Sequence, residues 1–210
     1  MSLGITLENG CNIVHGRAAN LKRPFSDIPV EMHELNDGKH TSAANSKIST
    51  IFSGQFGFIS FDTSTRLPRH VHISLSSTSQ NERYPKQTLV TERILVLDGV
   101  ALVELNGTVY IVAPGSLVTI APGVPHTWTA CPAGVTLPDG EISQGTFLMV
   151  YEYEKYTGFF PTCQLRTLES VDEYVHFDGN LDTIKFPWLT KDEVVARGQL
   201  FWEKEVMKLE

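Results

Sequence analysis

ERILVLDGVALVELNGTVYIVAPGSLVTIAPGVPHTWTA, residues 92–130, is the stretch that decides the fold. Short runs of Val, Ile and Leu alternate here with Asp98-Gly99, Asn106-Gly107 and Pro114-Gly115, which are pairs that favour chain reversal. Asn-Gly between two apolar runs is the strongest short signal for a hairpin with a type I′ turn. The stretch therefore predicts a series of antiparallel strands.

The same alternation of apolar runs and turn residues extends outward to about residues 48 and 155. The predicted strands span 48–52, 56–62, 70–74, 92–97, 100–105, 108–112, 116–120, 126–130 and 146–154. Many short strands with turn signals between them are typical of an all-β sandwich or barrel.

The two flanks differ from this central region. Residues 1–46 contain breaker pairs such as Asn9-Gly10 and Arg23-Pro24, which predict an extended N-terminal arm. The barrel is predicted over 47–160, and a C-terminal helical extension that packs on it over 161–210. In that extension Thr190-Lys-Asp-Glu193 forms a capping box, and Val194, Phe201 and Val206 follow at roughly helical spacing.

Composition excludes several classes of protein. The 210 residues include 17 Lys and Arg against 24 Asp and Glu, a net charge of −7, which argues against a nucleic-acid partner. No run reaches about 18 apolar residues, so no membrane span is predicted. The N-terminus lacks the features of a secretory signal, and the three cysteines form no Cys-x-x-Cys pair. A cytoplasmic protein is expected.

Two histidines in one predicted strand form the first candidate site. His70 and His72 are two residues apart, so they share a strand face with Cα atoms about 6.8 Å apart. Two imidazoles at that separation can reach one metal ion. The alternative is a chance pair without any ligand.

Glu92 and His126 each occur at the start of another predicted strand. Glu92 shares a face with Ile94 and Val96, and a buried carboxylate needs a cation or a proton. The alternative is a carboxylate at a strand end that reaches solvent or pairs with an arginine. His126 follows a Pro-Gly turn that restricts its direction, and its alternative role is that of a core histidine.

Together these elements resemble the two sequence motifs of the cupin superfamily. The first motif reads Gly-x5-His-x-His-x3–4-Glu-x6-Gly, and the matching positions here are His70, His72, Glu92 and Gly99. The second reads Gly-x5-Pro-x-Gly-x2-His-x3-Asn, and the matching positions here are Gly115, Gly123 and His126. The resemblance covers about residues 66–130. It implies a single double-stranded β-helix, the cupin jelly-roll barrel, with His70, His72, Glu92 and His126 as metal ligands.

The chain departs from the first motif mainly in length. His72 and Glu92 are separated by 19 residues in place of three or four, and Ser64 replaces the first glycine. In the second motif Ala121 and Ala130 replace Pro and Asn. A hairpin loop can lengthen without moving its strands, so Glu92 is retained as a ligand. The polar segment 74–91 is predicted to be either a functional lid or a disordered insertion.

The ligand set and the resemblance together favour a metal-dependent enzyme. Three histidines and a carboxylate without a thiolate suit Fe(II), Mn, Ni, Zn or Cu. The resemblance implies a non-haem metal dioxygenase or other oxidoreductase acting on a small organic molecule, with Fe(II) favoured and Glu92 as a possible catalytic base. The alternatives are a metal-dependent isomerase, lyase or hydrolase, and a non-catalytic module that binds a small ligand. A homodimer is expected, because edge strands and arms often pair across a two-fold axis.

Several other side chains have simpler expected roles. The remaining histidines are expected at the surface or around the site: His15, His33, His40 and His176. Core filling is expected for four aromatic residues of the flanking strands: Phe56, Phe58, Tyr151 and Tyr153. Trp128 shares the face of His126 and is expected to form a wall of the site.

Overall fold

The computed structural model describes residues 4–18, 20–22, 32–34, 55–74, 87–155 and 157–209. Its strands are β1 (Ile5–Thr6), β2 (Asn12–Val14), β3 (Asn20–Lys22), β4 (Met32–Glu34), β5 (Gln55–Asp62), β6 (His70–Ser74), β7 (Glu92–Gly99), β8 (Ala101–Leu105), β9 (Thr108–Val112), β10 (Leu117–Ile120), β11 (His126–Ala130), β12 (Thr146–Tyr153), β13 (Thr157–Pro161), β14 (Gln199–Trp202) and β15 (Glu205–Met207). One α-helix, α1 (Lys191–Arg197), and three 3₁₀ turns (Gly16–Ala18, Val171–Glu173 and Leu181–Ile184) complete the described elements.

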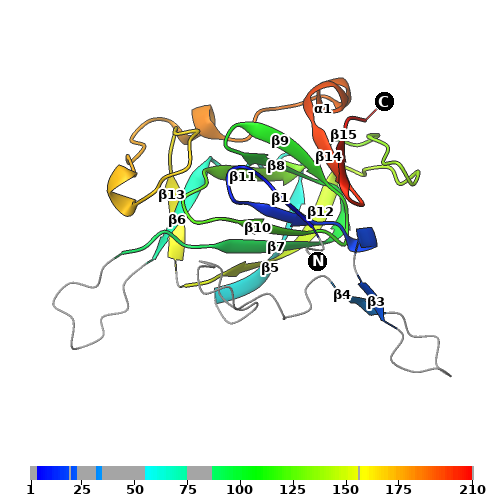
Figure 1. Ribbon diagram of the computed structural model, residues 1–210. Helices are drawn as coiled ribbons and strands as arrows, with labels where there is room; N and C mark the ends of the chain where they lie inside the picture. The colour runs from blue at the N-terminus through cyan, green and yellow to red at the C-terminus, as the bar shows by residue number, and fades with distance from the viewer. Residues whose placement is uncertain are drawn as a thin grey trace.

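Two sheets form the body of the molecule (Figure 1). The six-stranded sheet has the order β1-β2-β10-β7-β12-β5, and the seven-stranded sheet has the order β13-β6-β11-β8-β9-β14-β15. A third, two-stranded sheet pairs β3 with β4. The all-β, two-sheet architecture that the cupin-type motifs predict is confirmed.

The predicted strands agree closely with the observed ones. Strands β6, β9 and β11 have the predicted bounds, and β5, β7, β8, β10 and β12 differ by one or two residues at an end. The strand predicted at 48–52 lies outside the described residues. Asn106 and Gly107 join β8 to β9 with φ angles of 50° and 80°, the left-handed pair that a type I′ turn requires. The Asn-Gly prediction is therefore confirmed.

Strand β8 is buried on both faces, which explains its nearly continuous apolar sequence. Ala101, Val103 and Leu105 face the core between the two sheets. Leu102 belongs to a second core, on the outer side of the seven-stranded sheet. C-terminal side chains fill this second core: Phe186, Val194 and Leu200. The chain after β13 therefore covers a face of the sheet that would otherwise be apolar and exposed.

The C-terminal region is less helical than predicted. Thr190 and Glu193 form the predicted capping box at the start of α1, but the helix ends at Arg197. Phe201 and Val206 pair in strands β14 and β15, and β14 extends the seven-stranded sheet parallel to β9. The helical reading of these positions was wrong. Their side chains are placed by an available sheet edge, which local spacing does not reveal. Among the described residues, no helix is both long and apolar enough to cross a membrane.

The long connection between β6 and β7 is closed at its base. Residues 75–86 lie outside the described residues, so neither the lid nor the insertion reading is tested. On either side, the Ser74 amide donates to the Thr88 carbonyl over 2.8 Å, and the Val90 amide donates to the His72 carbonyl over 3.0 Å. These bonds return the chain beside β6 before β7 begins, so the 19-residue gap does not separate Glu92 from the histidines.

Candidate metal centre

Three buried imidazoles lie on adjacent strands of the seven-stranded sheet. His70 and His72 come from β6, and His126 comes from β11, with His126 opposite His70 in the register. All three residues are at most 2% exposed. One ring nitrogen from each lies within 4.8 Å of the others, so the three histidines form a group that could hold a metal ion.

Backbone carbonyls set the orientation of each ring. The Nδ1 atoms of His70, His72 and His126 lie 2.7, 2.9 and 2.8 Å from the carbonyl oxygens of Pro68, Gly158 and Val124, respectively. A carbonyl can only accept, so each Nδ1 carries the proton and donates it. The Nε2 atom of each neutral ring is then left with a free lone pair, as metal-binding histidines require.

Glu92 approaches this group from the opposite sheet, at the start of β7. Its Oε2 lies 2.8 Å from Nε2 of His126 and 3.5 Å from Nε2 of His72. Among the described residues, none of these three buried atoms has a hydrogen-bond partner. Three acceptors held this closely in a dry site need a cation between them, either a proton or a metal ion. The donor set therefore fits a bound metal.

The electrostatics of the cluster keep its members in the forms that bind metals. Burial alone would raise the pKa of Glu92, but the adjacent imidazoles of His72 and His126 outweigh it and hold that pKa well below the ordinary range. Burial lowers the pKa of His70 well below its usual value, and the neighbouring His126 and His72 lower it further. An anionic carboxylate thus faces the imidazole group, in which the His70 ring is neutral.

Aromatic side chains enclose the cluster on two sides. The ring of Tyr153, which lies opposite Glu92 in the register, is 4.4 Å from that of His72. Burial and the nearby Glu92 carboxylate raise the pKa of Tyr153, so its hydroxyl keeps its proton. Phe159 on β13 packs 4.6 Å from the ring of His70 and is 51% exposed, so it lies between the cluster and solvent.

The four predicted ligand residues are brought together from three strands and two sheets. Phe159 and the Gly158 carbonyl were missed, because the run Thr157–Pro161 contains Gly and Pro and does not resemble a strand. The two consecutive aromatic residues after Gly158, Phe159 and Phe160, were the available signal. Trp128 is buried in the core between the sheets, and its Nε1 has no partner among the described residues.

Some of the simpler expectations were wrong. His15 is 2% exposed, so it is not a surface histidine, whereas the side chain of His176 is 67% exposed. Phe58 does not fill the core, because it is 76% exposed on the outer face of β5. Tyr151 packs against the core beside Tyr153. The side chains of His33, His40 and Phe56 lie outside the described residues.

Comparison with known proteins adds a partial match. No family model matches the chain, and no curated protein matches it. The crystal structure of a cupin 2 domain-containing protein from Halorhodospira halophila is similar to 46% of this chain, with 22% identity and a TM-score of 0.26. The chain covers 49% of that protein, about half its length.

The chain combines two facing sheets with a buried histidine triad. The cupin-type motifs predicted both features from residues 66–130, and the triad is a possible metal site within that fold.

Proposed function

We propose that this chain is a metal-dependent cupin enzyme, most specifically a non-haem iron dioxygenase that acts on a small organic molecule. His70, His72, His126 and Glu92 would hold the ion. The observation that carries the proposal is the convergence of three unpartnered acceptor atoms, two imidazole Nε2 atoms and one carboxylate oxygen, in a buried site. Such a group is costly for the fold unless it binds a cation that the protein uses.

The donor chemistry limits the choice of metal. Imidazole and carboxylate ligands without a thiolate suit Fe(II), Mn(II), Ni(II), Zn(II) or Cu(II). When bound, such an ion supplies Lewis acidity, and iron additionally supplies electrons for reaction with dioxygen. Iron is the ion we favour, because the proposed dioxygenase reaction would need a redox-active ion held by these four residues.

The surrounding side chains favour a planar, weakly polar substrate. Tyr153 and Phe159 present aromatic rings beside the histidines. The two arginines closest in sequence to the ligands are ion-paired: Arg69 contacts Glu104 at 2.7 Å, and Arg93 contacts Glu152 at 3.0 Å. Neither guanidinium is therefore available to bind a phosphate or a polycarboxylate. An enol or phenol, with a hydroxyl that can lose its proton, fits this environment.

Glu92 is the residue that we assign to proton transfer. Its carboxylate is anionic, and the Tyr153 hydroxyl and the His126 ring are adjacent to it. A carboxylate in this position can accept the hydroxyl proton of the substrate. Tyr153, which keeps its own proton, positions that carboxylate.

Metal analysis followed by oxygen measurements tests the proposal. Protein stripped by a chelator is reloaded separately with Fe(II), Mn(II), Ni(II) or Zn(II), and oxygen uptake is recorded with catechol and related enols as probes. Oxygen consumption by the iron form alone supports the dioxygenase. Turnover under argon with Zn(II) or Ni(II) would support an isomerase, lyase or hydrolase instead. Failure to retain any of the metals would overturn the metalloenzyme proposal.

A further inference from the structure

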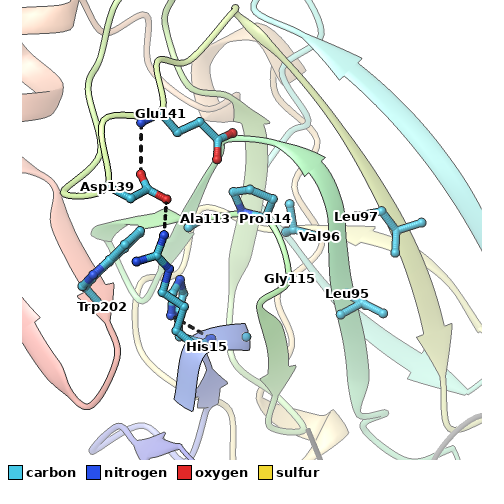
Figure 2. A pocket seen from close by; sticks show the side chains of 12 residues that line it. His15, Leu95, Val96, Leu97, Ala113, Pro114, Gly115, Asp139, Glu141 and Trp202 are labelled. Carbon is cyan, nitrogen blue, oxygen red and sulfur yellow. Dashed lines mark hydrogen bonds and ion pairs between the residues drawn. The ribbon is translucent and has the colours of Figure 1, made fainter. Parts of the chain in front are cut away.

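A second cavity lies away from the histidine cluster. It has a volume of about 430 Å³, within the range of small-molecule sites. Figure 2 shows Leu95 and Leu97 on one side of it, with Asp139, Glu141 and Trp202 on the other. The cavity is assembled from strands β7 and β14, the turn before β10, the 3₁₀ turn after β2 and the segment that follows β11.

Strand β7 separates this cavity from the metal centre. Glu92, Ile94 and Val96 are buried, and the side chains of Ile94 and Val96 face the core between the sheets. The alternate residues Leu95 and Leu97 point to the outer face, where Leu97 is 48% exposed. Leu97 is five residues beyond Glu92 in the strand, so it lies roughly 16 Å farther along β7. A ligand in this cavity would therefore not touch the histidine cluster.

One wall of the cavity is aromatic and already binds a cation. The Arg17 guanidinium lies 5.0 Å from the centre of the Trp202 ring and forms a 2.8 Å ion pair with Asp139. The His15 ring packs 4.5 Å from Trp202. Burial, followed by the charge of Arg17, lowers the pKa of His15, so this imidazole adds no positive charge at neutral pH.

The same side of the cavity also carries a carboxylate without an ion-pair partner among the described residues. Glu141 lines the cavity, and its carboxylate has no ion pair within the part of the chain that the structure describes. Partial burial raises the pKa of Glu141, and the charges of Asp139 and Asp98 raise it further. Two carboxylates, Asp139 and Glu141, thus line a cavity that holds one guanidinium, and the Arg17 charge is already paired with Asp139.

We propose that this cavity binds a small organic cation, an amine with an aromatic or otherwise apolar body. Its ammonium group would pair with Glu141, and its body would lie on the apolar side formed by Leu95, Leu97 and Pro114. Charge complementarity favours this occupant over an anion, which would have to compete with Asp139 for Arg17. Small-molecule sites are usually lined by apolar side chains with a few polar groups that point into the cavity.

Three indole compounds of similar size and different charge test the proposal by calorimetry on the full-length protein. Tryptamine is the cationic probe, tryptophol the neutral one and indole-3-acetate the anionic one. Tryptamine is expected to bind at least about tenfold more tightly than tryptophol, because only its ammonium group can form a charged hydrogen bond with Glu141. Its binding should weaken with added salt. Equal binding of all three, preference for indole-3-acetate, or no tryptamine binding at millimolar concentration would overturn the proposal.

Variants locate the bound probe. Glu141→Gln is expected to weaken tryptamine binding about tenfold and to leave tryptophol binding unchanged. Glu173→Gln, which alters a carboxylate outside the cavity, should leave both unchanged. His126→Ala should also leave tryptamine binding unchanged, because the metal centre is separate. Loss of binding in His126→Ala, or retention of full affinity in Glu141→Gln, would show that tryptamine binds elsewhere.

Discussion

The ligating capacity of the candidate metal centre is decided by one proton on each imidazole. His70 and His126 both donate from Nδ1 to the carbonyl two residues earlier, whereas His72 donates to a different strand. Each bond leaves Nε2 free, where it meets the other ligands and Glu92. Backbone acceptors thus select which nitrogen binds a metal, as the carbonyl and carboxylate partners of ligating histidines generally do.

His126→Ala should abolish most metal binding and preserve the fold. The substitution removes one Nε2 and leaves a small space at the end of β11, while the strands around it keep their pairing. Metal content by plasma mass spectrometry is expected to fall at least about tenfold, with an unchanged far-ultraviolet circular dichroism spectrum. His176→Ala is the control, because its side chain is 67% exposed. Full metal content in His126→Ala would exclude His126 as a ligand.

Glu152→Ala should strongly destabilise the protein. Glu152 and Arg93 form an ion pair at 3.0 Å in which both side chains are at most 2% exposed. Removing the carboxylate leaves a buried guanidinium without its charge partner, at a cost of about 3–5 kcal/mol in the free energy of unfolding. Urea denaturation measures this loss.

The matched control for that ion pair is Glu173→Ala. Glu173 contacts Arg166 at 2.8 Å, but the Arg166 side chain is 68% exposed, so the expected loss is within about 1 kcal/mol. Equal losses in the two variants would show that burial does not determine the strength of these pairs.

At the scale of elements, the turn between β7 and β8 closes the sandwich at one point. The chain leaves β7, which belongs to the six-stranded sheet, at Gly99 and enters β8 of the opposite sheet at Ala101. Gly99 has a φ of 68°, and a Cβ atom there would lie 2.1 Å from the Thr146 carbonyl oxygen. The close approach of β12 explains why a glycine is needed at the end of the first motif.

Gly99→Ala should therefore be among the most damaging single substitutions. The positive φ costs about 1–2 kcal/mol for alanine, and relief of the clash with Thr146 requires backbone movement, which raises the expected loss above about 4 kcal/mol. Gly140→Ala is the control, since Gly140 has a φ of 87° but nothing within 4 Å of the added methyl group. Thermal unfolding should separate the two variants. Similar melting temperatures would show that the close approach of β12 is not the reason for a glycine at position 99.

Shortening the connection between β6 and β7 should change substrate handling more than stability. Its base is held by hydrogen bonds between residues 74 and 88 and between residues 72 and 90. Replacing residues 76–86 with a short Gly-Ser linker should leave the melting temperature within a few degrees of the parent value. The KM of the iron form for its substrate should change. A large fall in melting temperature with unaltered KM would identify the segment as structural.

At the scale of the whole molecule, the outer face of the six-stranded sheet carries an apolar row. Register places Phe58 beside Val150, then Leu95 and Leu117. Leu117 is 8% exposed and Phe58 is 76% exposed, so exposure is highest at the β5 end of the row. A large exposed aromatic side chain on the last described strand of a sheet is typical of a contact surface.

We expect a homodimer that covers this end of the row. Sedimentation velocity should give twice the monomer mass for the parent protein and a monomer for Phe58→Asp, because the added charge would be buried in the contact. Ser60→Asp alters the next outward residue of β5 and should weaken the dimer less. A monomeric parent protein would refute the expectation.

Local sequence signals predicted most of the barrel. Strands β6, β9 and β11 and the Asn106-Gly107 turn follow from alternation and turn chemistry within a few residues, which is why they were found from the sequence. The packing of the C-terminal region on the barrel was predicted, but its strand β14 was not, because β14 takes its place from a distant sheet edge. Phe201 and Val206 fitted a helix locally, but β9 offered an unpaired edge to β14.

The sequence by itself determined the identity and order of His70, His72, Glu92 and His126, and the β character of the strands that carry them. Tertiary structure decided that two sheets bring these four side chains together, that a distant carbonyl orients His72, and that Tyr153 and Phe159 enclose the site. The physical reason is that period-2 alternation records the face on which a side chain lies. The alternation does not indicate which strand lies opposite that face, because strand pairing and the packing of the two sheets determine this.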